Sequence, residues 1–292
     1  MIVDVHTHCW PSLESFSPSF LADAQRMRTA PVNLIARYEY YQAETAGEEV
    51  VTIAFGGKAR LSGLWLDDAE VAAYVAHDPR RMIGFMALDP TQPGWEDEMR
   101  EGRERLGLRG IKLMPMYAGF YPQDERLDSL WRYAAEHGLP VLLHTGTTFV
   151  SQAPIDCTLP RNLDAVARRH PDVKMVLAHL GHPYEGETVA VIRKHSNLYA
   201  DVSALHYRPW QLFHGLMLVH EYNVWDKLLF GTDYPVTTVA ESLAGLRALC
   251  DIRIDRFAVP RQRIEEVIYR DALALLGLPD PRGGMAPAAV AR

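Results

Sequence analysis

Short apolar runs rich in β-branched residues alternate with amphipathic helical stretches along most of the chain. We predict eight strands, at residues 2–8, 49–55, 82–88, 109–114, 140–144, 173–179, 198–202 and 228–232. Helical patterns separate them, and a further helix, at residues 260–276, follows the last strand–helix unit. Alternating strands and helices indicate βαβ units with a parallel sheet, and eight such units can close into a barrel.

The connections between these elements are unequal in length. Long segments follow several strands, at residues 9–30, 56–66, 115–126 and 145–160, whereas a short turn at 137–140 leads into the fifth strand. In a barrel the strand-to-helix loops form the C-terminal face, where active sites lie. The sequence therefore predicts a single (β/α)8 TIM barrel of the α/β class over residues 1–280, with an extra C-terminal helix and a peripheral tail at 281–292.

The composition argues against several other classes of protein. With 30 basic and 37 acidic residues among 292, the net charge is −7, and no basic stripe is present to bind nucleic acid. No apolar run approaches the roughly 20 residues that span a bilayer. Cys9, Cys157 and Cys250 show no paired spacing, and the first residues show no secretory pattern. We therefore expect a cytoplasmic protein that binds neither nucleic acid nor membrane.

The strongest chemical signal lies at the end of the first strand. His6 and His8 are two residues apart in an extended run, which places both imidazoles on one face. The same alternation predicts that Asp4 also faces the barrel interior, while Val3 and Val5 face the outer helices. Two imidazoles so placed suit a metal ion, although a His-x-His pattern alone fits a hydrogen-bonded structural pair equally well.

Three further side chains end other predicted strands at the same face. His144 and His179 close the fifth and sixth strands, and Asp233 follows the eighth. Histidines together with a carboxylate form a ligand set that suits Zn²⁺ and related divalent ions. Buried polar residues that satisfy loop backbones are the alternative, but the matching positions on three strands favour a metal centre.

This constellation resembles the amidohydrolase superfamily, in which a His-x-His pair, two histidines and an aspartate occupy strands one, five, six and eight. Residues 110–113, 177–181, 229–235 and 264–278 are similar to the branch with aminocarboxymuconate-semialdehyde decarboxylase-like proteins and TIM-barrel metal-dependent hydrolases. The resemblance spans essentially the whole chain. It implies one divalent metal, which we expect to be Zn²⁺, with four ligands: His6, His8, His144 and Asp233. It also implies that His179 is the acid or base that activates water, while Asp233 binds the metal, moves the water proton, or does both.

Lys112 allows an alternative to a single metal. Alternation points this side chain, in the fourth predicted strand, into the barrel. Elsewhere in the superfamily a lysine on this strand is carbamylated and bridges two metals, so the resemblance also allows a binuclear site. The ammonium could instead bind a substrate carboxylate or pair with Asp4 or Asp201, because a buried lysine needs such a partner. We favour the ion pair and one metal.

Aromatic side chains are frequent in the long loops, as in pockets that bind flat or ring-like organic molecules. Trp10 follows the first strand, and Tyr207 and Arg208 follow the seventh. All three are candidate substrate contacts, and Arg208 is the best-placed cation for a carboxylate, with Lys112 as the other candidate. The expected partner is thus a small-molecule substrate, and the sequence leaves a homodimer open.

These residues predict a metal-dependent hydrolase of the amidohydrolase type, in which activated water attacks an amide, ester or lactone carbon. Its expected catalytic residues are His179 and Asp233. Non-oxidative decarboxylation of an unsaturated or aromatic carboxylic acid at the same centre is the first alternative. A catalytically silent metal-binding barrel is the second, and the intact set of ligands and base argues against it.

Overall fold

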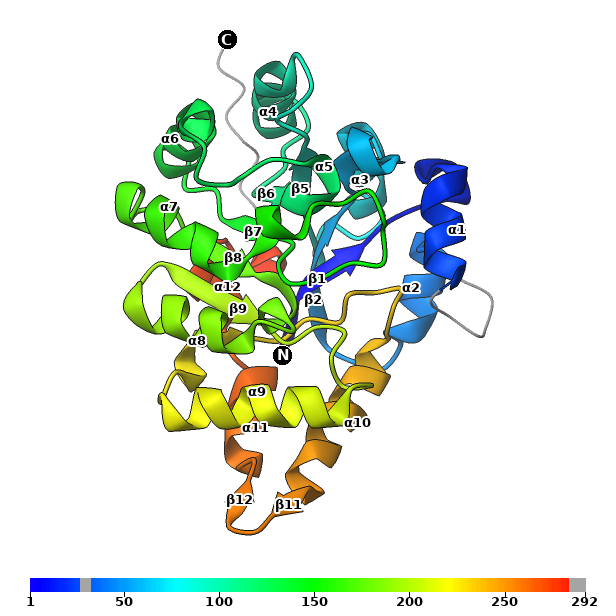
Figure 1. Cartoon of the computed structure of the whole chain (residues 1–292). Helices are drawn as coiled ribbons and strands as arrows, with labels where there is room; N and C mark the ends of the chain where they lie inside the picture. The colour runs from blue at the N-terminus through cyan, green and yellow to red at the C-terminus, as the bar shows by residue number, and fades with distance from the viewer. Residues whose placement is uncertain (27–32, 284–292) are drawn as a thin grey trace.

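Eight parallel strands form the centre of the structure, a computed structural model that describes residues 1–26 and 33–283. The strands pair with their neighbours in chain order around the sheet (Figure 1). Their bounds are β1 Ile2–His8, β2 Val50–Phe55, β5 Met82–Leu88, β6 Ile111–Leu113, β7 Val141–Leu143, β8 Met175–Leu177, β9 Leu198–Asp201 and β10 Leu228–Leu229. Every predicted strand is present. The last five end earlier than predicted, because the chain leaves the sheet there to form the loops that carry the candidate site.

The first and last strands meet and close the sheet into a barrel. Thr7 and Tyr234 form a parallel bridge, and the backbone N–H of Asp233 donates to the carbonyl of His6 at 2.8 Å. Gly231 permits this approach, because a Cβ there would lie 2.9 Å from Cβ of His6. The predicted (β/α)8 barrel is confirmed, and its closure brings two candidate site residues onto adjacent strands.

Helices surround the strands and bury the outer face of the sheet (Figure 1). Their bounds are α1 Pro18–Arg26, α2 Tyr38–Glu44, α3 Asp68–Val75, α4 Trp95–Glu104, α5 Pro115–Ala118, α6 Asp128–Glu136, α7 Leu163–Arg169, α8 Glu185–Lys194, α9 Pro209–Glu221, α10 Val239–Ala248, α11 Arg261–Ile268 and α12 Ala272–Leu276. Their apolar side chains pack against outward-facing strand residues such as Met86, Ile111 and Val141. In the described part of the chain, no helix combines the length and apolar character needed to cross a membrane.

Two short antiparallel hairpins interrupt the barrel pattern. β3 Lys58–Ala59 pairs with β4 Leu64–Trp65 inside the long loop after β2. β11 Arg253–Ile254 pairs with β12 Phe257–Ala258 between α10 and α11, and Figure 1 shows this hairpin projecting at one end of the molecule. Neither hairpin contributes to the eight-stranded sheet.

A β-bulge in β1 changes which of its side chains face inward. Between Asp4 and Thr7, β1 contains one residue more than the matching stretch of β2. Val3 and Val5 consequently belong to the inner apolar cluster. Asp4 lies on the other face, where Thr7 and Thr232 donate to its carboxylate. The prediction that the two valines face outward and Asp4 inward is therefore wrong, because simple alternation cannot anticipate an inserted residue.

The C-terminal helical segment is broken where the sequence predicts one continuous helix. α11 packs in the outer layer of the core, while α12 belongs to the inner cluster and contacts β1. The carboxylate of Asp271 accepts from the backbone N–H of Ala274 at 3.0 Å and caps the start of the second helix. The break lets α12 cover the end of the barrel where Val3 and Val51 lie, away from the C-terminal ends of the strands.

Candidate active site

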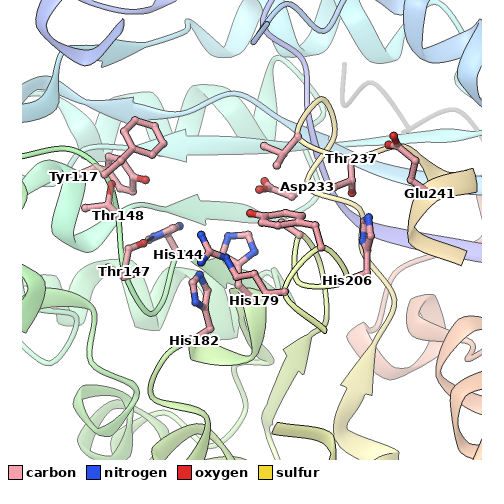
Figure 2. Close-up of a pocket in the computed structure, with 15 residues that line it drawn as sticks. Tyr117, His144, Thr147, Thr148, His179, His182, His206, Asp233, Thr237 and Glu241 are labelled. Atoms are coloured by element: carbon pink, nitrogen blue, oxygen red, sulfur yellow. Dashed lines mark hydrogen bonds between the residues drawn. The ribbon is translucent and has the colours of Figure 1, made fainter. Parts of the chain in front are cut away.

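A pocket of about 720 Å³ lies at the C-terminal ends of β6 to β10 (Figure 2). Its walls are the loops that follow these strands, together with α5 and the start of α10. The lining residues are Tyr117, His144, Thr147, Thr148, Phe149, His179, His182, Ala204, His206, Tyr207, Arg208, Asp233, Val236, Thr237 and Glu241. Figure 2 shows Tyr117 and Thr148 across the pocket from Thr237 and Glu241, with His179 between the two sides.

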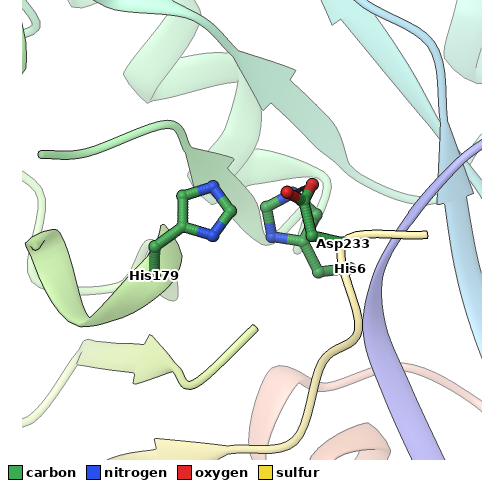
Figure 3. Close-up of side chains that lie close together, drawn as sticks. All are labelled: His6, His179 and Asp233. Carbon is green, nitrogen blue, oxygen red and sulfur yellow. Dashed lines mark ion pairs between the residues drawn. The ribbon is translucent and has the colours of Figure 1, made fainter. Parts of the chain in front are cut away.

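Three of the predicted site residues form a compact group at this pocket (Figure 3). Ligand atoms of His6, His179 and Asp233 lie within 4.8 Å of one another. His6 belongs to β1, while the other two follow β8 and β10. The φ angles of His179 and Asp233 are 57° and 62°, in the left-handed region. Non-glycine residues keep such a backbone only where surrounding contacts hold it, and these positions cluster at functional sites.

His8 joins this group through Asp233. Oδ1 of Asp233 lies 3.1 Å from Nε2 of His8 and 3.2 Å from Nε2 of His6. The ring of Trp10 stacks on that of His8, with centroids 4.0 Å apart. This stacking holds the plane of the His8 ring.

His144 packs beside the ring of His179 and is outside the compact group of His6, His179 and Asp233. Its ring centroid is 5.3 Å from that of His179, and it forms a T-shaped contact with the Tyr117 ring, at 4.9 Å between centroids. Nε2 of His144 lies 3.0 Å from the carbonyl oxygen of Thr147. Because a carbonyl only accepts, Nε2 carries the hydrogen and Nδ1 is the nitrogen left to bind a metal.

Burial dominates the protonation of three histidines in this region. It lowers the pKa of His8 to about 4, and it also lowers the pKa values of His144 and His179. Burial raises the pKa of Asp233, but the charge that His179 carries when protonated, together with hydrogen bonds from His6 and His8, outweighs it. The pKa of Asp233 therefore lies well below its usual range, and neutral His8, His144 and His179 rings surround an ionised carboxylate near pH 7.

The donor atoms fit a divalent metal. Nε2 of a neutral His6 and Oδ1 of Asp233 are both acceptors, so a proton or a metal cation must lie between them at 3.2 Å. Burial and Lys112 lower the pKa of His6, but Asp201 and Asp233 raise it overall, so a proton holds this place when no metal does. Imidazole nitrogens with a carboxylate oxygen suit Zn²⁺ and neighbouring transition metals.

Ser203 was not predicted as a site residue from the sequence, and Asp201 was predicted only as a partner of Lys112. Oγ of Ser203 lies 2.9 Å from Nδ1 of His179, and Oδ2 of Asp201 lies 3.0 Å from Nδ1 of His6. A signal was present, because these two polar residues alternate at the end of the seventh predicted strand. Several pocket residues were also missed: Thr147, Thr148, Thr237 and Glu241.

Lys112 points into the barrel as predicted, but its predicted ion pair is not found. Nζ of Lys112 lies 3.3 Å from Nε2 of His6 and 4.5 Å from the centre of the Phe55 ring. Asp4 faces outward because of the bulge, and Asp201 bonds to His6. The prediction that Lys112 pairs with Asp4 or Asp201 is therefore wrong. Burial lowers the pKa of Lys112 to about 8, although Asp233 and Asp201 act in the opposite direction.

The other predicted substrate contacts divide between the pocket and the core. Tyr207 and Arg208 line the pocket and are exposed, with the guanidinium 5.4 Å from the centre of the tyrosine ring. Trp10 is buried against His8, and neither it nor Lys112 is among the residues that line the pocket. Arg208 is consequently the one lysine or arginine in the described lining.

Comparisons with known proteins place this chain in a family. A family model described as amidohydrolase matches residues 3–278. A search of curated protein sequences found no match. Among solved structures, an uncharacterized TIM-barrel protein from Bordetella bronchiseptica is 20% identical, with a TM-score of 0.69 over 94% of this chain and 99% of that one.

Two further solved structures carry names that describe a reaction. A probable 2-pyrone-4,6-dicarboxylic acid hydrolase from Acinetobacter baumannii is 14% identical, with a TM-score of 0.64 over 95% of this chain and 99% of that one. A 5-carboxyvanillate decarboxylase from Novosphingobium aromaticivorans, with bound manganese, is 15% identical, with a TM-score of 0.65 over 95% and 97%. These likenesses establish the barrel fold. Because the family model spans nearly the whole chain, this protein belongs to the amidohydrolase family.

Proposed function

We propose that the protein is a metal-dependent hydrolase that adds water to the carbonyl carbon of a neutral or monoanionic ester, lactone or amide. One observation carries this proposal: the ionised carboxylate of Asp233 and the neutral imidazole of His179 both line the same pocket. A water molecule between them could donate a hydrogen bond to either group, so either group could accept its proton.

The proposed metal ligands are those that the resemblance implies: His6, His8, His144 and Asp233. Zn²⁺ is the proposed ion; when bound, it would lower the pKa of water towards about 7 and polarise a carbonyl oxygen. His179 would take the proton of the attacking water at Nε2 and return it to the leaving group. Arg208 would hold an anionic group of the substrate at the exposed side of the pocket.

The distribution of positive charge favours hydrolysis over decarboxylation. A decarboxylase must hold a carboxylate close to the reacting centre, yet Arg208 is the one cationic side chain in the described lining and it is exposed. The buried ammonium of Lys112 is the observation that supports the alternative, because it lies 3.3 Å from Nε2 of His6. Non-oxidative decarboxylation of an aromatic or unsaturated acid, as in the name of one structural relative, is therefore the second candidate.

One experiment separates these reactions. The metal-loaded protein is incubated with a panel of esters, lactones, amides and aromatic or unsaturated carboxylic acids, and both acid release and CO₂ are measured, with His179→Asn as the control. The proposal expects hydrolytic turnover that the substitution abolishes. Stoichiometric CO₂ release without hydrolysis would replace it with the decarboxylase, and no turnover of either kind would favour a silent metal-binding barrel.

A further inference from the structure

The buried carboxylate of Asp201 contacts both His6 and His179, the two histidines grouped with Asp233. Asp201 is fully buried at the end of β9, and its Oδ2 lies 3.0 Å from Nδ1 of His6. Its Oδ1 accepts from the backbone N–H groups of His179 and Ser203, at 2.9 Å and 3.1 Å, and from the hydroxyl of Ser203. A carboxylate with this many donors is ionised and acts only as an acceptor.

This arrangement fixes the tautomer of His6. Because Asp201 can only accept, the ring hydrogen of His6 must lie on Nδ1. Nε2 is then the nitrogen whose proton a metal ion can replace, and it is the atom that lies 3.2 Å from Oδ1 of Asp233. Asp201 thus directs the metal-binding nitrogen of His6 towards the other candidate ligand.

The same carboxylate acts on His179 through Ser203. The hydroxyl of Ser203 has a single hydrogen, which it donates to Oδ1 of Asp201. It must therefore accept from Nδ1 of His179, which lies 2.9 Å away. The hydrogen of the neutral His179 ring is thereby held on Nδ1, so Nε2 is free to act as a base or a ligand.

Asp201 also supports the unusual backbone that presents His179. The φ angle of His179 is 57°, and the N–H of this residue donates directly to Asp201. The bond ties the turn after β8 to the end of β9. One side chain therefore orients both the backbone and the ring of His179.

We propose that Asp201 and Ser203 are positioning residues that hold His6 and His179 as Nδ1–H tautomers, with both Nε2 atoms available for the reaction. The inference rests on the proposed site at His6 and His179 but not on which reaction that site performs. It distinguishes these rings from His8, whose buried Nδ1 has no hydrogen-bond partner among the described residues.

Imidazole ¹⁵N chemical shifts report the tautomers directly, without a substrate. The full-length protein, labelled with ¹⁵N-histidine, is compared with Ser203→Ala and Ser203→Thr. We expect His179 to be Nδ1-protonated in the unsubstituted protein and to lose part of that preference in Ser203→Ala, where the longer contact of 3.4 Å between Nδ1 and the carbonyl of Ser203 remains. Ser203→Thr, which retains a hydroxyl, is expected to recover the full preference. Ser242→Ala is the matched control, because the buried Ser242 hydroxyl is hydrogen-bonded to Thr237 and, in the part of the chain that the structure describes, to no histidine.

Zn²⁺ affinity, measured by competition with a chelator, tests the Asp201 arm. In Asp201→Asn the amide group either donates to Nδ1 of His6 or faces the donors of Ser203, so one of the two contacts is lost. We expect Zn²⁺ to bind about 10–100-fold more weakly, as for other partners of metal-binding histidines. A His179 tautomer that is unchanged in Ser203→Ala, or a Zn²⁺ affinity that is unchanged in Asp201→Asn, would overturn the proposal whether or not the protein is a hydrolase.

Discussion

The ammonium nitrogen of Lys112 lies 3.3 Å from Nε2 of His6, the same nitrogen that faces Oδ1 of Asp233. A buried cation therefore stands next to the nitrogen that a metal would use. The positive charge of Lys112 and that of a divalent ion repel each other at this range, unless the lysine is itself converted to a ligand.

Replacing Lys112 by methionine removes the charge and keeps the length of the side chain. We expect Lys112→Met to retain one metal per chain and to bind Zn²⁺ more tightly, as measured by elemental analysis and chelator competition. Lys227→Met is the control, because Lys227 lies over the Tyr199 ring at 4.7 Å, away from the site, much as Lys112 lies over Phe55 at 4.5 Å. A second metal that disappears in Lys112→Met would support a carbamylated lysine and a two-metal centre.

His179→Asn tests the difference between a base and a ligand. Asparagine tolerates the left-handed backbone at this position, where φ is 57°, so the turn is expected to remain intact. We expect the metal to stay bound while turnover falls by about 10²–10⁴-fold, the usual contribution of a general acid or base. If metal content falls together with turnover, His179 is a ligand and not only a base.

Arg208→Ala tests how the pocket holds an anion. For a monoanionic substrate we expect KM to rise by about tenfold, as for loss of one charge-assisted hydrogen bond, with a smaller change in kcat. A neutral substrate is expected to show little change. Arg256→Ala is the control, because Arg256 lies 5.2 Å from the Phe257 ring on the distant β11–β12 hairpin. A fall in kcat at constant KM would instead indicate that Arg208 acts in the transition state.

The α7 and α8 segments meet at Asp164, which offers a test of stability against pH. Hydrogen bonds from Lys194 and His195 lower the pKa of Asp164 to about 2, below its unfolded value. The stabilisation is therefore present above about pH 4 and is lost as the pH falls towards 2. We expect Asp164→Asn to lower the free energy of unfolding by about 1 kcal/mol near pH 7. This difference from the unsubstituted protein is expected to become smaller below pH 4.

Urea unfolding across this pH range measures the difference in free energy of unfolding between the unsubstituted protein and Asp164→Asn. Asp172→Asn is a suitable control, because Asp172 is exposed on a nearby turn and forms no ion pair within the described residues. A difference that stays constant down to the lowest pH would show that Asp164 acts through something other than its charge.

The sequence predicted the architecture because each strand and helix carries its own periodic pattern. It also predicted that five side chains lie at one face, since each stands at a strand end and strand ends meet on one face of a barrel: His6, His8, His144, His179 and Asp233. The sequence could not predict which side chains at the start of β1 face the barrel interior. The inserted residue between Asp4 and Thr7 leaves no local signature, yet it reverses the two valines and Asp4.

That reversal also explains why the partner of Lys112 was wrongly predicted. With Asp4 turned outward, the ammonium packs against His6 and Phe55, which lie far from it in the sequence. Ser203 was missed for a related reason. A serine can be assigned a role only when the ring that it contacts is known. Ser203 follows β9 and its partner His179 follows β8, so the two are distant in the sequence.

We propose that this barrel holds one divalent metal on ligands that include His6 and His8. Elemental analysis of the purified chain and of His6→Ala and His8→Ala measures it directly, with His182→Ala as a pocket histidine outside the group. We expect one metal per chain in the unsubstituted protein and in His182→Ala, and a marked loss in the other two variants. An unchanged metal content in both His6→Ala and His8→Ala would contradict it.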